Sequence, residues 1–374
     1  MQNQVVAEVN LSALEANYRT LAALAAPARV IAPVKADAYG HGAVACAQRL
    51  AEAGTAMLAV VSLNEALELR DAGIKTPILV MGVTDPKRID EAVARRITVA
   101  VHSREYGQAY AEAAKRADGT VICHVHADTG MHRMGTPCDD VVPLIEALTE
   151  SRHVKVEALM THHSHSEDTD PSITNEQREL LARLAADLER RGLRPPVVHA
   201  ANSAALMRFG REDFDMVRPG IALYGVTPCP ELTPDVQLRP IMTIRAPIVT
   251  IKDVPAGQGV SYSHTWVADR PSRVAALPVG YADGYRRGLS NRTVARVKGR
   301  LVPAVGNVCM DTTLIDVTDV PQARVGSMAT MMEAQTDSPL SVYALAGLLG
   351  TIPHEIFCGI GRRVRRVYVG DESV

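Results

Sequence analysis

The chain has 374 residues, 47% hydrophobic and 22% charged, which is enough for about two packed domains. Its 40 Lys and Arg against 42 Asp and Glu leave a formal net charge of -2. This balance argues against a strongly basic nucleic-acid-binding protein and against an acidic disordered one. No apolar run reaches the roughly 18 residues that span a bilayer, and residues 1–10 lack a signal-peptide pattern. We therefore expect a cytoplasmic protein with no membrane or nucleic-acid partner.

From residue 29 to about residue 225, short apolar runs alternate with amphipathic helical stretches. The candidate strands cover residues 29–34, 57–61, 78–81, 97–101, 121–126, 154–160, 197–201 and 215–218. Apolar runs of this kind predict strands that are covered on both faces, and the alternation with helices predicts a parallel sheet. The repeated units favour a closed (β/α)₈ barrel. An open doubly wound sheet would carry a glycine-rich loop after its first strand, and none occurs there.

The sequence changes character after Pro228. Strands are expected within residues 241–251 and over 274–279, 293–297, 312–317 and 364–369, with one helix over 342–349. The basic stretch 362–366 is interpreted as the solvated edge of a sheet. We predict a barrel domain over residues 1–236 and a mostly β domain over residues 237–374.

No metal site is expected. The six cysteines are scattered and contain no C-x-x-C pair, so neither a disulfide scaffold nor zinc spacing is present. The run His162-His163-Ser164-His165 also matches no standard zinc pattern.

The first expected barrel strand ends in a lysine, Lys35. Barrels carry their functional groups at the carboxyl ends of strands. Burial and nearby cations can lower the pKa of such a lysine and make it a nucleophile or a Schiff-base former. Taken alone, Lys35 is better interpreted as an ordinary lysine whose stem extends to solvent at the barrel rim.

The residues around Lys35 decide between these interpretations. The segment Val34-Lys-Ala-Asp-Ala-Tyr-Gly-His-Gly42 resembles the pyridoxal-phosphate signature of alanine racemases. Further matches follow in order over residues 128–135, 160–162, 199–203, 217–225, 259–262, 277–284 and 306–311. The resemblance covers both predicted domains and implies a barrel followed by a β domain. It also implies interconversion of L- and D-alanine with pyridoxal phosphate, which would supply D-alanine for peptidoglycan.

The resemblance assigns residues to the cofactor. Lys35 would carry pyridoxal phosphate covalently, His162 would face its ring, and Arg218, with His199 beside it, would face the pyridine nitrogen. The residues implied to contact the phosphate are Tyr39, Asn202, Ser203, Gly220, Ile221 and His354.

The resemblance also implies a base on each face of the substrate. Lys35 would act on D-alanine and Tyr262 on L-alanine. Arg133 would meet the substrate carboxylate, while Met310 and Tyr281 would line the substrate entrance. In the family, the β domain reaches the other subunit's barrel, so the resemblance implies a homodimer with shared active sites.

Two positions depart from the family pattern. His126 occupies a position that is usually lysine, often carbamylated to orient the arginine, and His354 replaces a tyrosine. A smaller residue at 354 predicts a roomier site that also accepts serine. The alternatives are a racemase of serine or of several small amino acids, a decarboxylase of the same barrel class, and a non-catalytic pyridoxal-phosphate carrier. Such carriers lack the β domain.

Overall fold

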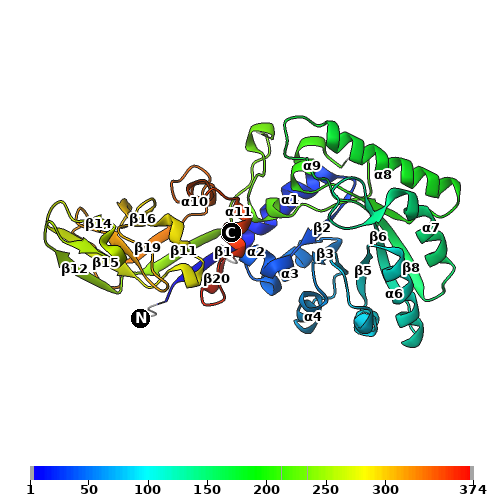
Figure 1. The fold of residues 1–374 in the computed structure, drawn as a ribbon, viewed down its shortest axis with the longest axis horizontal. Helices are drawn as coiled ribbons and strands as arrows, with labels where there is room; N and C mark the ends of the chain where they lie inside the picture. The colour runs from blue at the N-terminus through cyan, green and yellow to red at the C-terminus, as the bar shows by residue number, and fades with distance from the viewer. Residues whose placement is uncertain (1–3, 212, 234, 371–374) are drawn as a thin grey trace. The chain divides into compact units, whose positions relative to one another are not determined.

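The computed structural model describes residues 4–211, 213–233 and 235–370. Within these residues the chain divides into two units. The first, here called the barrel unit, contains Leu14–Ala38 and Ala43–Leu238. The second, here called the β unit, contains residues up to Ala13, the short segment Tyr39–Gly42, and residues from Arg239 onward. Figure 1 follows both units along the chain.

Eight parallel strands close the barrel. They are β2 (Arg29–Pro33), β3 (Met57–Val60), β4 (Ile78–Val80), β5 (Ile97–Val101), β6 (Val121–Asp128), β8 (Val154–Met160), β9 (Val197–His199) and β10 (Met216–Val217). Their order is β5-β4-β3-β2-β10-β9-β8-β6, and pairing of β5 with β6 completes the ring. The two-residue β7 (Thr136–Pro137) extends the sheet beside β6. The predicted (β/α)₈ barrel is confirmed, with each strand within a few residues of its expected range.

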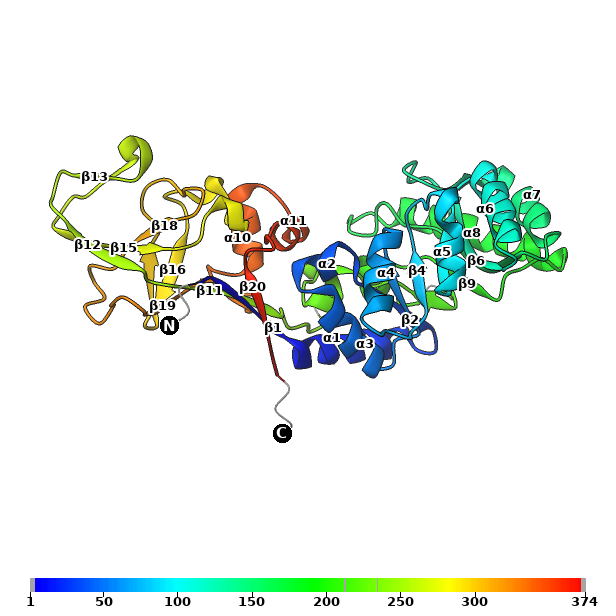
Figure 2. The same cartoon turned by 90° about the horizontal axis from the view of Figure 1, so that it is seen from below.

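Helices cover the outside of the strands, as Figures 1 and 2 show for α6 and α7 beside β6. The helices of this part of the chain are α1 (Leu11–Ala25), α2 (Lys35–Gly40), α3 (Ala43–Glu52), α4 (Leu63–Asp71), α5 (Ile89–Ala94), α6 (Arg104–Arg116), α7 (Cys138–Thr149), α8 (Ser172–Arg190) and α9 (Ser203–Phe209). Several begin at a side-chain cap: the Ser62 side chain accepts from the Glu65 N–H, and the Asn202 side chain accepts from the Ala205 N–H. Each such cap contributes about 1 kcal/mol.

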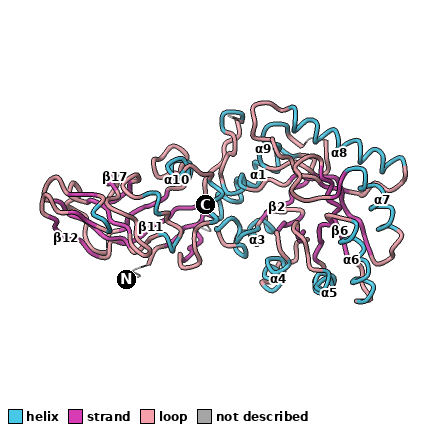
Figure 3. Tube along the Cα trace, in the orientation of Figure 1, coloured by secondary structure: helices cyan, strands magenta, loops and turns pink. Residues whose placement is uncertain are grey.

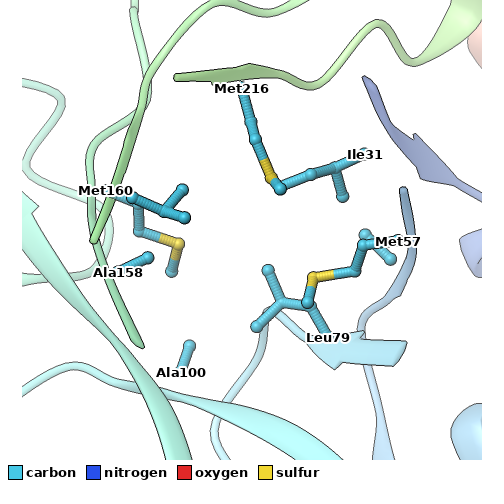
Figure 4. Packing of buried hydrophobic residues seen from close by; sticks show 9 residues of the cluster. Ile31, Met57, Leu79, Ala100, Ala158, Met160 and Met216 are labelled. Atoms are coloured by element: carbon cyan, nitrogen blue, oxygen red, sulfur yellow. The ribbon is translucent and has the colours of Figure 1, made fainter. Parts of the chain in front are cut away.

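Apolar side chains fill the barrel. Figure 4 shows Ile31, Met57, Leu79, Met160 and Met216 pointing toward one another across its interior. These residues are at most 5% exposed. A packed interior leaves no channel, so polar groups that act on a ligand stand at the strand ends.

The β unit is built on a six-stranded sheet of order β17-β16-β19-β11-β1-β20. Its strands are β1 (Val6–Asn10), β11 (Met242–Pro247), β16 (Val294–Val297), β17 (Arg300–Pro303), β19 (Met328–Met332) and β20 (Arg365–Val369). A smaller sheet joins β12 (Thr250–Val254), β15 (Ser272–Leu277) and β18 (Thr313–Asp316), and β13 (Gly259–Val260) pairs with β14 (Trp266–Val267). Figure 3 shows how strands and loops dominate this unit, which confirms the mostly β prediction.

Two helices, α10 (Val342–Leu349) and α11 (Pro353–Cys358), lie in the β unit, where the sequence pattern indicated only the first. Helix α11 has six residues, too few for a periodic apolar stripe, and its cap residue Ile352 makes no side-chain cap bond. Across the described ranges, we find no helix with both the length and the apolarity needed to cross a bilayer.

Candidate active site

Lys35 begins α2 and is separated from the end of β2 by one residue. The next four residues, 36–39, have φ angles between 52° and 55°, so this turn is left-handed. A left-handed conformation costs roughly 1–2 kcal/mol for each residue with a Cβ atom. Strain of this kind is found where surrounding contacts hold a functional group in place.

Backbone donors of the turn bind carboxylates. The Ala36 N–H donates to Glu65 Oε1 at 2.7 Å, and Glu65 Oε2 accepts from the Ser62 N–H at 2.9 Å. The Ala43 N–H donates to Asp37 Oδ1 at 2.7 Å. Glu65 therefore ties the start of the Lys35 turn to the start of α4.

The other end of the turn, from Tyr39 to Gly42, belongs to the β unit and is bound within it. The Arg366 guanidinium donates to the Gly40 carbonyl at 2.8 and 3.0 Å, and also to the carbonyls of Ile360 and Gly361 at 2.8 and 2.6 Å. Tyr39 is 7% exposed, and its ring centroid lies 6.0 Å from that of His354. Burial raises the pKa of the Tyr39 phenol, so the hydroxyl is a hydrogen-bond donor at neutral pH.

Arg218 follows β10 and is buried. Its guanidinium donates to His199 Nδ1, to the Thr161 carbonyl at 2.5 Å, and to His162 Nδ1 at 3.3 Å. A guanidinium only donates, so both Nδ1 atoms are acceptors and both imidazoles are neutral. In agreement, burial and the Arg218 charge hold the pKa of His199 and of His162 well below the usual value.

The hydrogen-bond chain continues through the barrel. With Nδ1 of His199 an acceptor, its Nε2 carries the proton and donates to His124 Nδ1 at 3.0 Å. His124 Nε2 then carries its proton 3.5 Å from Glu157 Oε2, which lies on β8. His124 lowers the pKa of the Glu157 carboxyl. Arg218 thus sets the tautomers of two successive histidines.

Positive charge gathers at this end of the barrel. Burial is the main cause that lowers the His162 pKa, and the charges of Arg218, Arg133 and Lys35 lower it further. The charges of three predicted site cations therefore act on one imidazole. Such an arrangement favours an anionic ligand.

Backbone N–H groups that could bind an anion occur at Ser203, Gly220 and Ile221, which follow β9 and β10. Ser203 and Ile221 are buried, at 5% and 2% exposed. The backbone N–H groups of Ser203, Gly220 and Ile221 donate no hydrogen bond to any of the described residues, 4–211, 213–233 and 235–370. Buried N–H groups require a partner, and N–H groups that converge at a helix start suit a phosphate. These residues fit the phosphate of pyridoxal phosphate.

Asn202 has a different set of contacts. Its Oδ1 accepts from the Ala205 N–H at 3.0 Å and from Ser166 Oγ at 2.8 Å. Its Nδ2 donates to the His163 carbonyl at 3.4 Å. The side chain thus braces the loops after β8 and β9, and its phosphate contact stays a prediction.

Tyr262, Tyr281 and Met310 lie on linked loops of the β unit. They are 72%, 41% and 53% exposed. Asn307 Nδ2 donates to the Tyr262 carbonyl at 2.8 Å, and the Tyr281 N–H donates to the Cys309 carbonyl at 3.0 Å. Ser261 and Ser263, which flank Tyr262, have φ of 64° and 61°. The tyrosine is therefore presented to solvent on a strained backbone.

Sequence reasoning missed His102, His124, Glu65, Glu157 and Arg366. A signal for one of these existed, because His124 alternates along β6 with His126 and Asp128, so the three share a face. His126 Nδ1 lies 3.1 Å from His102 Nδ1, at the end of the neighbouring strand. Within the described parts of the chain, no group of three or more His, Cys, Asp or Glu side chains has the arrangement of a metal site.

A closed barrel with a strand-end lysine, joined to a β unit that presents a tyrosine, defines a two-domain barrel enzyme. Family models for the alanine racemase N-terminal and C-terminal domains match residues 9–228 and 241–368. The chain belongs to the alanine racemase family. It is an amino-acid racemase that interconverts the enantiomers of alanine, and the family depends on pyridoxal phosphate in general.

Relatives match over nearly their full length. An alanine racemase of Sorangium cellulosum is 42% identical over 97% of this chain and 98% of its own. "Alanine racemase 2" of Caldanaerobacter subterraneus subsp. tengcongensis is 40% identical over 97% and 94%. Among solved structures, alanine racemase from D-cycloserine-producing Streptomyces lavendulae has a TM-score of 0.93 at 36% identity, covering 99% of this chain and 98% of that one.

Proposed function

We propose that this chain racemises alanine with pyridoxal phosphate held on Lys35, using Lys35 and Tyr262 as the two bases. The observation that carries the proposal is the placement of Lys35 at the end of β2 and of the buried Arg218 after β10, where Arg218 binds His199 and His162. An amino-acid carboxylate and a phosphate are the anions that such a site would hold.

The residues present fit the cofactor. Lys35 supplies the amine for covalent attachment, and the unpaired N–H groups of Ser203, Gly220 and Ile221 suit the phosphate. The family resemblance adds Tyr39 and His354 to the phosphate contacts. When bound, pyridoxal phosphate withdraws electrons from the substrate α-carbon and so acidifies its C–H bond.

Arg218 controls how strongly electrons are withdrawn. Its pKa exceeds about 12, so it can donate a hydrogen bond to a pyridine nitrogen without transferring the proton. His199, neutral and fixed as an acceptor, holds the guanidinium in place. By leaving a bound cofactor's pyridine nitrogen unprotonated, Arg218 would limit charge delocalisation and would disfavour transamination relative to racemisation.

Inversion requires that a proton leave one face of the α-carbon and return to the other. Lys35 moves the proton on the D face and Tyr262 on the L face. Arg133 binds the substrate carboxylate and orients the α-carbon between these groups. In a cytoplasmic setting the D-alanine so formed would supply peptidoglycan synthesis.

The test uses the cofactor-loaded protein with L-alanine in D₂O. Proton NMR is expected to show loss of the α-hydrogen signal, and polarimetry is expected to show loss of optical rotation. A stable α-hydrogen with alanine and with serine would contradict the proposal.

We also propose a homodimer in which Tyr262 of each subunit completes the site of the other. The exposure of Tyr262, Met310 and Tyr281 supports this, because large apolar groups that share a surface mark an interface. A two-fold dimer contains two equivalent composite sites.

A mixture of two inactive variants tests the dimer. In a heterodimer of Lys35→Ala and Tyr262→Phe subunits, one shared site carries both changes and the other carries neither. Random reassociation of equal amounts is therefore expected to restore about a quarter of wild-type activity. Sites contained within one subunit would instead leave the mixture as inactive as its parents.

His354 is expected to set tolerance for serine. His354→Tyr restores the larger ring beside Tyr39 and narrows the site. Because exclusion of a small group from a pocket changes selectivity by about tenfold, the serine-to-alanine ratio of kcat/KM should fall by about that factor. Chiral chromatography of both reactions measures the ratio. An unchanged ratio would show that His354 does not determine the size of the site.

A further inference from the structure

We propose that His102 is a positioning residue: it fixes the tautomer of His126 so that the His126 Nε2 lone pair accepts a hydrogen bond from Arg133 in the substrate-bound enzyme. The proposal rests on the function proposed above, in which Arg133 holds the substrate carboxylate.

The two histidines stand on neighbouring strands. In the register of β5 with β6, Ala100 lies beside His124 and Val101 beside Val125, which brings His102 next to His126. Their Nδ1 atoms are 3.1 Å apart, and their ring centroids are 5.1 Å apart with the rings at 66°. His102 is 7% exposed, so water cannot replace this contact freely.

The proton positions follow from one carbonyl. His102 Nε2 lies 3.0 Å from the Met81 carbonyl oxygen, which only accepts, so Nε2 carries the proton. In a neutral His102, Nδ1 is then a lone pair, and His126 Nδ1 must donate to it. His126 Nε2 is left as an acceptor by the same rule. The Met81 carbonyl thus determines, through two rings, which nitrogen of His126 is free to accept.

Both rings are neutral. Burial lowers the pKa of His102. Burial, together with the nearby His102, Arg218 and Arg133, lowers the pKa of His126 to about 3, against the opposing effect of Asp128. Since their Nδ1 atoms are 3.1 Å apart, only one of these two atoms can carry a proton.

Of the two arginines whose charges act on His126, Arg133 has unused donors. The two terminal nitrogens of Arg218, Nη1 and Nη2, already donate to His199, Thr161 and His162. Arg133 is exposed, and over the described ranges it makes no hydrogen bond to the protein. Arg133 lies on the loop that follows β6, the strand of His126, and we assign His126 Nε2 as the acceptor that orients it.

The Asp128 carboxylate, two residues after His126, already accepts other hydrogen bonds. Asp128 accepts from the Gly130 N–H and the His132 N–H, each at 3.0 Å, and from His132 Nδ1 at 3.2 Å. It therefore shapes the loop that carries Arg133. A neutral acceptor at 126 orients the guanidinium while leaving its whole charge for the substrate carboxylate.

Substitutions at His102 test the proposal. In His102→Gln, the amide can donate to the Met81 carbonyl and accept from His126 Nδ1, so the tautomer is kept. In His102→Leu no acceptor faces His126 Nδ1, so the tautomer of His126 is no longer fixed. We expect His102→Leu to raise the KM for alanine about tenfold with a smaller change in kcat, and His102→Gln to restore it. His165→Gln, at the same end of the barrel but outside the pair, serves as the matched control and should leave KM unchanged.

Nitrogen-15 NMR of the imidazole rings supplies a readout independent of turnover. In the cofactor-loaded enzyme the His126 signals, assigned by their loss in His126→Gln, should show a protonated Nδ1 and an unprotonated Nε2. His102→Leu should populate the other tautomer. A protonated Nε2 in the wild type, or an unchanged KM in folded His102→Leu, would overturn the proposal. Absence of any alanine turnover would instead refute the proposed function and leave the tautomer measurement interpretable.

Discussion

Lys35→Ala is expected to abolish racemisation of both L- and D-alanine, with turnover reduced about 10⁴-fold or more. The substitution removes two functions at once, the amine that attaches the cofactor and the base on one face of the α-carbon. It should also remove the visible absorption of lysine-bound pyridoxal phosphate. Chiral chromatography of each reaction and an absorption spectrum of the loaded protein measure the two losses.

Lys35→Arg tests whether positive charge alone at this position can replace cofactor attachment and proton transfer. It keeps a cation at the strand end, but a guanidinium neither attaches the cofactor nor releases a proton near neutral pH. We expect it to be as inactive as Lys35→Ala. Lys75→Ala, which removes an exposed lysine from the barrel unit, should leave activity unchanged. Turnover in Lys35→Ala above about one per cent of wild type would show that Lys35 is not essential to the chemistry.

The barrel was predictable because its strands are buried on both faces. An apolar run such as Ile78–Val80 has few alternatives to a core strand when helical stretches flank it. The N-terminal strand β1 gave no comparable signal. Its alternating residues pair with β11, more than two hundred positions along the chain, and with β20 at the other end of the sequence. Pairing between strands this far apart in the sequence depends on the whole fold rather than on the local sequence pattern.

The Lys35 turn shows a second limit of sequence reasoning. Residues 36–39 contain no glycine or asparagine, yet all are left-handed. Distant partners bind both ends of this turn: Glu65 accepts from the Ala36 N–H, and Arg366 donates to the Gly40 carbonyl. The interpretation of residues 362–366 as a sheet edge was correct only for Arg365 and Arg366, which begin the edge strand β20. It did not reveal that the Arg366 side chain binds the Gly40 carbonyl.

Site residues were predictable by type and motif, but their partners were not. The resemblance pointed to Arg218 and to His199 beside it, whereas the continuation to His124 and Glu157 crosses from β9 to β6 and β8. In the same way, His126 was visible as a departure from the family pattern, and His102 was not. Which side chain completes a hydrogen bond depends on strand register, and in this barrel β6 shifts register at Cys123/His124.

Tyr262→Phe is expected to lower kcat/KM by about 10²- to 10⁴-fold, the range for loss of a general acid–base group. The phenyl ring keeps the shape of the side chain and removes only the proton-transferring hydroxyl. Since the enantiomers of alanine have equal free energy, kcat/KM must fall by the same factor in both directions. Turnover alone therefore cannot assign Tyr262 to one face of the substrate.

Exchange of the α-hydrogen in D₂O makes that assignment. Lys35 remains in Tyr262→Phe, so D-alanine should still exchange its α-hydrogen and keep its configuration, while exchange from L-alanine should be lost together with inversion. Proton NMR of each pure enantiomer follows the exchange, and chiral chromatography follows the configuration. Tyr106→Phe, which removes a hydroxyl from helix α6, is the matched control and should change neither. If L-alanine exchanged faster than D-alanine in Tyr262→Phe, the two bases would have to be exchanged between faces. If both exchanged at wild-type rates, Tyr262 would not be a base at all.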